Sequence, residues 1–458
     1  MESIWTKTCR MPAFLSLTAG MDVDVAVIGG GMAGILTAYL LKDSGLSVAV
    51  FEKDKIGRGA TAFTTAKITS QHGRIYTDLI KYLGREKARQ YAATQQKAIS
   101  CYKKIAEQEH ISCCLEETSS YLYSTVDAEQ LKKEEESAVT LGLPASFTRQ
   151  TELPFPVTGA VRFEHQAQFH PLRFLRAVAS QLTVYEHAEA LKIHGHRIDI
   201  RSGRDIHTVR AGQIVIATHF PLLNIPGFYF LRQHQELSYL LALDRAAHLT
   251  GMYYCCDPGG YTFRSFDRYT LFGGLGHRSG KLCPGDSYRR LWHHARRMYP
   301  RAAVAAHWSN EDPMPHDRVP FIGPYSIWMP HLYVATGFQK WGMTGAMTAA
   351  LSLSDQILGR SDGHYSIYSP QRLSVRSGLG PFLTDVGHTT VHLLLQKPFV
   401  PYGKKNRIEK GFGPTCTHLG CTLSYNPADH TWDCPCHGSR FTEDGTPLTG
   451  PARRPLKE

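Results

Sequence analysis

The sequence predicts an α/β fold built on a parallel sheet, followed by a small separate C-terminal domain. Residues 23–28 form an apolar, β-branched run, a glycine-rich turn covers 29–34, and a helical pattern follows over 35–42. A second β-rich run at 47–51 completes a strand–helix–strand unit about thirty residues long. We expect the parallel sheet to begin with this unit.

Two later apolar runs, at 213–218 and 332–336, have the pattern of further buried strands. The chain therefore returns to its first sheet late, and the first domain is expected to be discontinuous. A polar helical stretch at about 85–140 and a strand-rich stretch at about 228–310 lie between these returns. We assign both stretches to a second, α+β region.

The composition changes after Gly359, where Ser, Gly, Arg and Tyr replace the periodic pattern until about residue 381. Such a stretch is typical of a linker. We therefore expect one domain over residues 1–370, and a linker with a second domain over 371–458.

Charge and hydropathy exclude several classes of protein. The 458 residues include 51 Lys and Arg against 40 Asp and Glu, a net charge of +11, but these basic residues are dispersed and form no stripe that would fit nucleic acid. Mean hydropathy is −0.26, and no apolar window approaches the roughly 20 residues of a membrane span. The apolar patch at 14–17 is too short for a signal peptide, so we expect a cytoplasmic protein.

The glycine-rich turn has the spacing of a dinucleotide site. Gly29, Gly31 and Gly34 lie between a strand and a helix, where glycines permit a tight turn and close approach of the backbone to a pyrophosphate. Glu52, at the end of the second strand, is placed to accept hydrogen bonds from an unphosphorylated ribose. The alternative is a glycine-rich turn used only for packing.

Two further segments resemble the D-amino-acid oxidase/glycine oxidase superfamily. Residues 57–67 resemble its flavin-proximal loop, and residues 335–344 resemble its late flavin-contacting turn. Residues 3–5 and 167–171 are similar to a branch of that superfamily fused to an iron-sulfur domain. The resemblance implies a Rossmann-like FAD-binding domain, with the α+β region facing the substrate. The flavin contacts that it implies are Thr61, Thr64, Thr65, Lys67, Gly337, Gly342, Met343 and Thr344.

The same resemblance implies oxidation of a C–N bond of a small amine or amino acid by hydride transfer to FAD. Arg264 is a candidate for pairing with a substrate carboxylate, because a guanidinium offers a planar, two-pronged donor. His277 is a second candidate catalytic residue. For both residues a structural role is the alternative. His72, near the flavin loop, is a possible site of covalent FAD attachment, with an unattached histidine as the alternative.

The C-terminal domain carries two metal-ligand motifs, Cys416-x-His418 and Cys434-x-x-His437. Zinc is a rival for two cysteines and two histidines, but zinc fingers present a cysteine pair and then a histidine pair, whereas each motif here supplies one of each. The motifs resemble those of the small all-β Rieske [2Fe-2S] domain. The resemblance implies that the two thiolates hold one iron and the two imidazoles hold the other.

Other residues near these motifs extend the resemblance. Cys421 and Cys436 occupy the positions of the disulfide that links the cluster loops in respiratory and photosynthetic Rieske proteins, with two free thiols as the alternative. Ser439 is placed to donate a hydrogen bond to the cluster, and residues 450–452 resemble the proline-containing loop that covers it. Residues 381–415 lack a clear pair of strands, so we expect an abbreviated base for this domain.

The combination suggests a dehydrogenase in which FAD takes two electrons from the substrate and the cluster passes them singly to an unknown acceptor. In one alternative, electrons enter from an unknown donor at the cluster and run to the flavin. In another alternative, the protein is a redox sensor whose cofactors report the redox state and catalyse no reaction.

Overall fold

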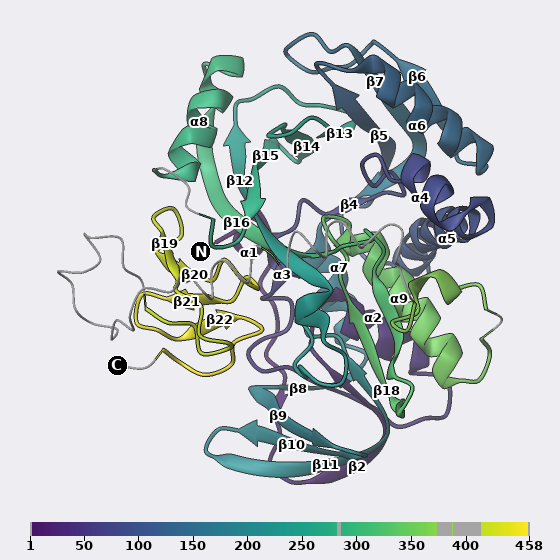
Figure 1. Cartoon of the computed structure of the whole chain (residues 1–458), viewed down its shortest axis with the longest axis vertical. Coiled ribbons are helices and arrows are strands. Elements are labelled where there is room, and N and C mark those ends of the chain that lie inside the picture. The colour runs from purple at the N-terminus through teal and green to yellow at the C-terminus, as the bar shows by residue number, and fades with distance from the viewer. Residues whose placement is uncertain (1, 282–284, 362, 373–386, 388–413, 457–458) are drawn as a thin grey trace.

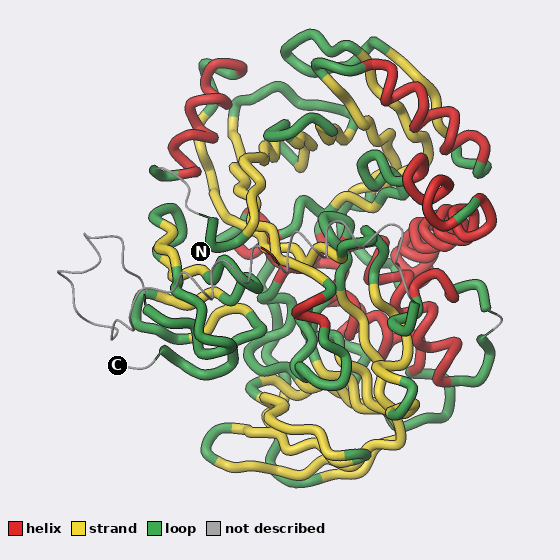
Figure 2. The backbone as a smooth tube through the Cα atoms, viewed as in Figure 1, coloured by secondary structure: helices red, strands yellow, loops and turns green. Residues whose placement is uncertain are grey.

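Three sheets organise the part of the chain that the structure describes. The computed structural model describes residues 2–281, 285–361, 363–372, 387 and 414–456. A mostly parallel sheet lies at the bottom of the view in Figure 1, a large antiparallel sheet lies at the top, and a small sheet near the C-terminus lies against one side. Figure 2 shows that most helices gather on the opposite side of the molecule from the small sheet, with one helix above the small sheet.

The first sheet is the predicted parallel one. Its central strand β2 (Met21–Ile28) pairs in parallel with β3 (Val48–Phe51) on one side and with β11 (Asp205–Ile216) on the other, and β18 (Met329–Thr336) extends it beyond β11. Helix α2 (Met32–Leu41) follows β2 and packs against α9 (Gly342–Ile357). The late returns to the sheet are thus confirmed. The other strands are β1 (Leu15–Ser16), β8 (Thr183–Glu186), β9 (Ala188–His194), β10 (Arg197–Ser202) and β17 (Phe321–Ser326).

The second sheet is antiparallel at all of its strand pairs but one. Strand β12 (Gln233–Asp244) lies between β15 (Tyr269–Arg278) and β16 (Ala303–Pro315), and α8 (Ser287–Met298) packs on this group. The order of the sheet is β16-β12-β15-β14-β13-β5-β7-β4, with β6 beside β7. The remaining strands are β4 (Lys67–Ile68), β5 (Glu116–Ser124), β6 (Ala145–Thr148), β7 (Gly159–Gln168), β13 (Met252–Cys255) and β14 (Thr262–Phe266).

The expectation of a helical stretch at about 85–140 is wrong in its middle. Helices α5 (Arg85–Gln108) and α6 (Ala128–Thr140) are separated by β5, which joins the second sheet beside β7. The polar side chains of β5 hid its alternation, because only its second half is buried. Helix α5 packs against α9, where the Tyr102 hydroxyl donates to the Met343 carbonyl at 2.9 Å. The other helices are α1 (Ile4–Thr8), α3 (Ala60–Phe63), α4 (Tyr76–Leu83), α7 (Pro171–Ala179) and α9 (Gly342–Ile357), with short 3₁₀ turns at Tyr229–Leu231 and Ser366–Tyr368.

The small sheet is the predicted all-β C-terminal domain. Its strands are short and pair in sequence order, each antiparallel to the next. The expectation of an abbreviated base falls on residues 381–415, most of which lie outside the described residues. Among the helices of the described ranges, none has the length and apolar character needed to cross a bilayer. The strands of this sheet are β19 (Ser424–Asn426), β20 (Thr431–Asp433), β21 (Arg440–Thr442) and β22 (Pro447–Thr449).

Candidate functional site

The glycine turn between β2 and α2 is held by close backbone contacts. Gly29 has a φ of +111°, and a Cβ there would lie 2.5 Å from the Ala217 carbonyl oxygen. A Cβ on Gly34 would lie 2.0 Å from the Gly29 carbonyl oxygen. A Cβ on Gly31 would find one neighbour within 4 Å, the Thr61 hydroxyl at 3.6 Å, so this side of the turn is open to a phosphate group. The turn therefore forms a cradle for a dinucleotide at the amino end of α2.

Glu52 lies half-buried beside this cradle. Its carboxylate accepts hydrogen bonds from the Gly30 N–H at 2.7 Å and from the Asp54 N–H at 3.0 Å. Burial raises the pKa of Glu52, and the two N–H donors oppose that rise. The carboxylate is therefore held rigidly by the backbone, with lone pairs left for ribose hydroxyls. This geometry fits the adenosine end of FAD.

The flavin-proximal loop is tied to the rest of the site through its own polar groups. The Thr61 hydroxyl accepts from the Met32 N–H at 3.0 Å, which joins this loop to the start of α2. The Thr64 hydroxyl accepts from the Ala66 N–H at 2.9 Å. Lys67 is buried and donates to the Tyr253 carbonyl and the Thr262 hydroxyl, and burial lowers its pKa well below the ordinary value.

Arg264 has backbone partners. Its guanidinium is 1% exposed and donates to the carbonyls of Thr65, Ala66 and Phe169 at 2.8–3.3 Å. Its Nε donates to the Ser265 carbonyl at 3.2 Å. These contacts of Nε and Nη1 hold the flavin-proximal loop in shape and favour the structural alternative, while pairing of Arg264 with a substrate carboxylate stays a prediction.

The late flavin turn joins β18 to α9. Gly337 lies in this turn with a φ of +77°, and Gly342 and Met343 begin the helix. The Thr344 hydroxyl donates to the Thr69 carbonyl at 3.1 Å. Helices α2 and α9 pack against each other, which brings together the early and late segments that are predicted to contact FAD.

His72 is held between these segments by both ring nitrogens. Its Nε2 lies 2.7 Å from the Thr69 carbonyl oxygen, and its Nδ1 lies 2.7 Å from the Tyr91 hydroxyl. The ring stacks on Trp341, with 4.9 Å between centroids. Burial lowers the pKa of His72 to about 3. These contacts favour the unattached histidine over a covalent flavin link.

A cluster of charged side chains that the sequence did not single out lies beside the late flavin turn. Glu236 and Asp312 are register partners on β12 and β16, and the Lys340 ammonium lies 3.2 Å from Glu236 and 3.8 Å from Asp312. Burial opposes ionisation of Glu236, but contacts with His234 and Lys340 lower its pKa to about 2. Burial raises the pKa of Asp312 to about 6. The only signal for this site was Lys340, inside the segment that resembles the flavin turn.

The two metal-ligand motifs form matching hairpin loops. The Gly420 N–H donates to the Cys416 carbonyl and the Gly438 N–H donates to the Cys434 carbonyl, each at 3.0 Å. The imidazole rings of His418 and His437 meet edge to face, with centroids 5.1 Å apart. The structure thus brings all four predicted ligands together.

The donor set of this site fits a cluster. Both ring nitrogens of His418 are buried and have no hydrogen-bond partner among the described residues, and a metal bound at one of them would offset part of that cost. A hydrogen bond from Cys434 lowers the pKa of Cys416, and the N–H groups of His418 and Leu419 and the Ser439 hydroxyl act in the same direction. Two cysteines and two histidines, arranged as one pair from each loop, match a Rieske ligand set.

The predicted disulfide is present. Cys421 and Cys436 are bonded to each other and join the two cluster loops. Their sulfur atoms lie within 4.8 Å of the Cys434 sulfur. The Ser439 hydroxyl also accepts from the Ala452 N–H at 2.9 Å, so the proline-containing loop is held over the same site.

The cluster loops dock on the second sheet. Phe230 packs edge-on against the rings of His418 and His437, at centroid distances of 5.3 and 5.4 Å. Gln235 and Arg278 donate hydrogen bonds to backbone carbonyls of the cluster loops. None of these three contact residues was predicted from the sequence.

His277 belongs to the same docking side of the second sheet. Its ring stacks on Tyr239 at 5.8 Å, and its Nδ1 lies 3.0 Å from the Leu275 carbonyl oxygen. Burial lowers its pKa. Its surroundings are those of a hydrogen-bonded structural residue, and its catalytic role stays a prediction.

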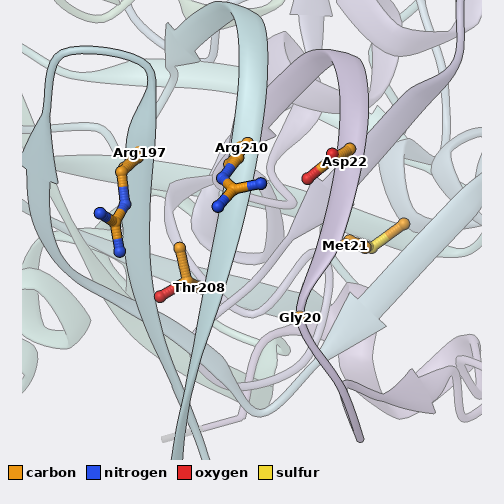
Figure 3. A pocket seen from close by; sticks show the side chains of 6 residues that line it. All are labelled: Gly20, Met21, Asp22, Arg197, Thr208 and Arg210. Atoms are coloured by element: carbon orange, nitrogen blue, oxygen red, sulfur yellow. The ribbon is translucent and has the colours of Figure 1, made fainter.

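An open depression of about 660 Å³ lies elsewhere on the first sheet (Figure 3). Gly20, Met21 and Asp22 line it at the start of β2, the opposite end of that strand from Gly29. Arg197 and Arg210 face it from the paired strands β10 and β11. It is therefore separate from the dinucleotide cradle.

Comparison with known families gives two matches along the chain. Residues 24–356 match the model of the FAD-dependent oxidoreductase family. Residues 385–458 match the model of the Rieske [2Fe-2S] domain. The first match covers most of the chain, and the second contains both metal-ligand motifs.

Individual relatives agree with these matches. A protein of Bacillus subtilis named as a Rieske 2Fe-2S iron-sulfur protein, YhfW, is 34% identical over 100% of this chain and 97% of its own length. The cytochrome b6-f complex iron-sulfur subunit 3 of Nostoc is 55% identical over 47 residues, which are 10% of this chain and 26% of that subunit.

Solved structures share the fold of the larger part. Glycine oxidase from Geobacillus kaustophilus superposes with a TM-score of 0.65 at 19% identity, covering 77% of this chain and 99% of the oxidase. L-amino acid deaminase from Proteus vulgaris gives 0.60 at 16% identity, covering 79% of this chain and 100% of the deaminase. The chain belongs to the FAD-dependent oxidoreductase family, and it carries a C-terminal Rieske [2Fe-2S] domain.

Proposed function

We propose that the protein is an amine or amino-acid dehydrogenase that passes electrons out of the molecule one at a time through its Rieske cluster. When bound, FAD accepts a hydride from the substrate, and the cluster carries single electrons. The observation that carries the proposal is the docking of the cluster loops on β12, the strand that also bears Glu236 beside the late flavin turn. The final acceptor is a one-electron carrier.

The charged cluster beside the flavin turn suits an amine substrate. Glu236 and Asp312 together carry more negative charge than Lys340 neutralises, so an ammonium group is attracted to them. Asp312, with its pKa raised to about 6, accepts a proton from the substrate nitrogen. Loss of that proton leaves the nitrogen lone pair free to support departure of the hydride from the neighbouring carbon. Next to Lys340, the rings of Trp341 and Tyr254 pack edge to face, with centroids 5.0 Å apart.

The structural neighbours support the class of substrate. Glycine oxidase and L-amino acid deaminase are both named for amino acids. Arg264 donates through Nη1 to backbone carbonyls, so this proposal does not depend on it to hold a substrate carboxylate. The proposal therefore covers amines without a carboxylate as well as amino acids.

An anaerobic titration tests the proposal. The purified holoprotein is mixed with a panel of amines, N-methyl amino acids and amino acids, while flavin bleaching and the Rieske electron-paramagnetic-resonance signal are followed together. We expect at least one compound to bleach the flavin, with the cluster signal following. The proposal fails if no compound bleaches the flavin while a reductase reduces the cluster, a result that favours the reverse direction of electron flow.

A further inference from the structure

We infer that Gln235 is a positioning residue for electron transfer between the two cofactors. It holds two loops of the C-terminal domain against β12: the ligand loop that contains His437 and the proline-containing loop that contains Gly450. Flavin and cluster can then exchange electrons within the docked structure. The inference rests on the proposed function for the source of the electrons, but its geometry is independent of the substrate.

Gln235 is fixed by two hydrogen bonds to the C-terminal domain. Its amide Nε2 donates to the His437 carbonyl at 3.2 Å and to the Gly450 carbonyl at 2.7 Å. Both amide protons are thereby used, and the residue is 1% exposed. One bond holds a loop that carries a predicted ligand, and the other holds the proline-containing loop. A single side chain thus fixes the two loops relative to β12.

At Gly438 the C-terminal domain lies so close to β12 that only glycine fits. A Cβ on Gly438, next to His437, would lie 2.5 Å from the Gln235 Cβ. Gly438 also has a φ of +82°, which L side chains rarely adopt. Backbone and side chain therefore meet in direct contact.

The same strand reaches the flavin turn two residues earlier. Gln233 and Gln235 point to one face of β12, because side chains alternate along a strand, and their Cα atoms are about 7 Å apart. The Gln233 amide donates to the Thr336 hydroxyl at 3.4 Å, and its Oε1 would lie 3.1 Å from a Cβ on Gly337. Two adjacent positions on one face thus touch the flavin turn and the cluster loop. This is a short, continuous route through protein atoms.

The imidazole side of the cluster site faces inward. Phe230 covers both histidine rings, and Arg278 donates to the carbonyls of Pro435 and Cys436 at 3.3 and 2.9 Å. A reduced flavin would give up its two electrons one at a time, and each would convert one ferric iron of the cluster to ferrous iron. The cluster then returns to its oxidised state by giving that electron to a one-electron carrier. The docked domain need not move for the first of these transfers.

The test compares Gln235→Met with Tyr239→Phe in the holoprotein. Tyr239 lies on the same strand, and its hydroxyl contacts the Asn426 side chain at 3.0 Å, away from the cluster loops. A laser flash with deazariboflavin reduces the flavin without any substrate, and the rate of cluster reduction is recorded. FAD-free protein measures direct reduction of the cluster by the probe. The cluster's electron-paramagnetic-resonance spectrum is recorded for each variant.

We expect Gln235→Met to slow the transfer roughly tenfold or more and to shift the cluster spectrum, as loss of an outer contact to a metal ligand does. Tyr239→Phe is expected to keep the wild-type rate and spectrum. Equal rates in Gln235→Met and wild type, or equal slowing in both variants, would overturn the inference. If Gln235→Met does not retain its cluster, Gln235→Asn, whose amide is too short for both carbonyls, is expected to give the same slowing. Failure of every amine to bleach the flavin would contradict the proposed function. The flash measurement would still test the role of Gln235, because it uses no substrate.

Discussion

The two cofactor sites of this chain are built in opposite ways. The dinucleotide cradle is made of backbone, from one strand–turn–helix unit inside a large parallel sheet. The cluster site is made of side chains, on two short loops of a small sheet. The first site is thus part of the core of its domain. The second site depends on its disulfide and on its metal-ligand bonds, because a small core alone does not hold its loops in place.

The cores of the two parts differ accordingly. The core around the first sheet includes Val25, Val27, Ile35 and Leu36, all fully buried. The described core of the C-terminal domain contains few residues, and four of them are cysteines. Its buried residues are Cys416, Cys421, Leu423, Trp432, Cys434, Cys436, Phe441, Ala452 and Leu456.

The largest expected effect is a substitution in the cradle. Gly34→Val should abolish FAD binding and destabilise the larger domain by about 3 kcal/mol or more, because its Cβ would clash with the Gly29 carbonyl. Flavin content after purification and thermal unfolding measure this. Gly45→Ala is the control: Gly45 has a φ of +83° but no neighbour within 4 Å, so it should cost about 1 kcal/mol and keep FAD. Retention of FAD by Gly34→Val would contradict a cradle made of backbone.

Removal of a cluster ligand should leave the flavin untouched. Cys434→Ser is expected to abolish the cluster spectrum, because a serine hydroxyl does not replace a buried thiolate on iron. FAD content should stay at the wild-type level, since the cradle lies in the other part of the chain. Iron and flavin analysis of the same sample checks both. Loss of FAD in this variant would mean that the two sites fold as one unit.

The disulfide should matter to the small domain alone. Cys421→Ser is expected to lower the stability of the cluster loops by about 3 kcal/mol, because the bond closes a loop of 15 residues. Heating while both absorption bands are followed should show the cluster lost at a lower temperature, with flavin release unchanged. A matched substitution at Cys101, a free cysteine of α5, controls for loss of a thiol. Equal loss of both bands would contradict the contrast between the two parts.

Docking of the two parts should weaken as pH rises. Burial raises the pKa of Glu311 on β16 to about 7, although Arg440 of the small domain and Ser279 oppose that rise. The folded protein holds this proton more tightly than the unfolded chain, so the stabilisation is complete below about pH 4.5 and is lost as the pH rises through about 7.

Glu311→Gln keeps the shape of this side chain and removes its titration. Its free energy of unfolding is expected to match that of the wild type near pH 5, and to exceed it near pH 8 by on the order of 2 kcal/mol. Urea unfolding of the cluster band at the two values measures the difference. A constant difference between variant and wild type across this range would show that Glu311 does not titrate there.

The smallest expected effect is electronic. The Ser439 hydroxyl contacts the Cys416 thiol, and a hydrogen bond to a cluster sulfur favours the reduced state. Ser439→Ala should lower the cluster potential by roughly 20 to 70 mV, the equivalent of one ordinary hydrogen bond. Redox titration of the cluster signal measures it, and the flavin potential serves as the internal control. An unchanged cluster potential would show that the Ser439 hydroxyl does not tune the cluster.

The sequence predicts features that are contiguous along the chain. The cradle at 29–34 and the loops beginning at Cys416 and Cys434 each contain their chemistry within a few residues, so their spacing alone identifies them. Strand β5 escaped notice because its first half is polar and exposed. The structural role of Arg264 was left open, because a sequence does not reveal the carbonyls that surround a buried guanidinium.

The contacts between the two parts were not predictable in the same way. Phe230, Gln235 and Arg278 come from two strands and a 3₁₀ turn, and they meet the cluster loops more than 150 residues later in the chain. A polar residue in a strand gives no sign of what will cover it. Such contacts depend on how domains dock, which local patterns do not encode.

In the proposed function, flavin and cluster act as one redox unit within the docked structure. The viscosity dependence of flavin-to-cluster electron transfer in the wild-type holoprotein tests whether they do. We expect the rate after flash reduction to stay constant as glycerol raises the viscosity several-fold, because no domain has to move. A rate that falls in proportion to viscosity would show that the C-terminal domain must undock, and that flavin and cluster do not form such a unit.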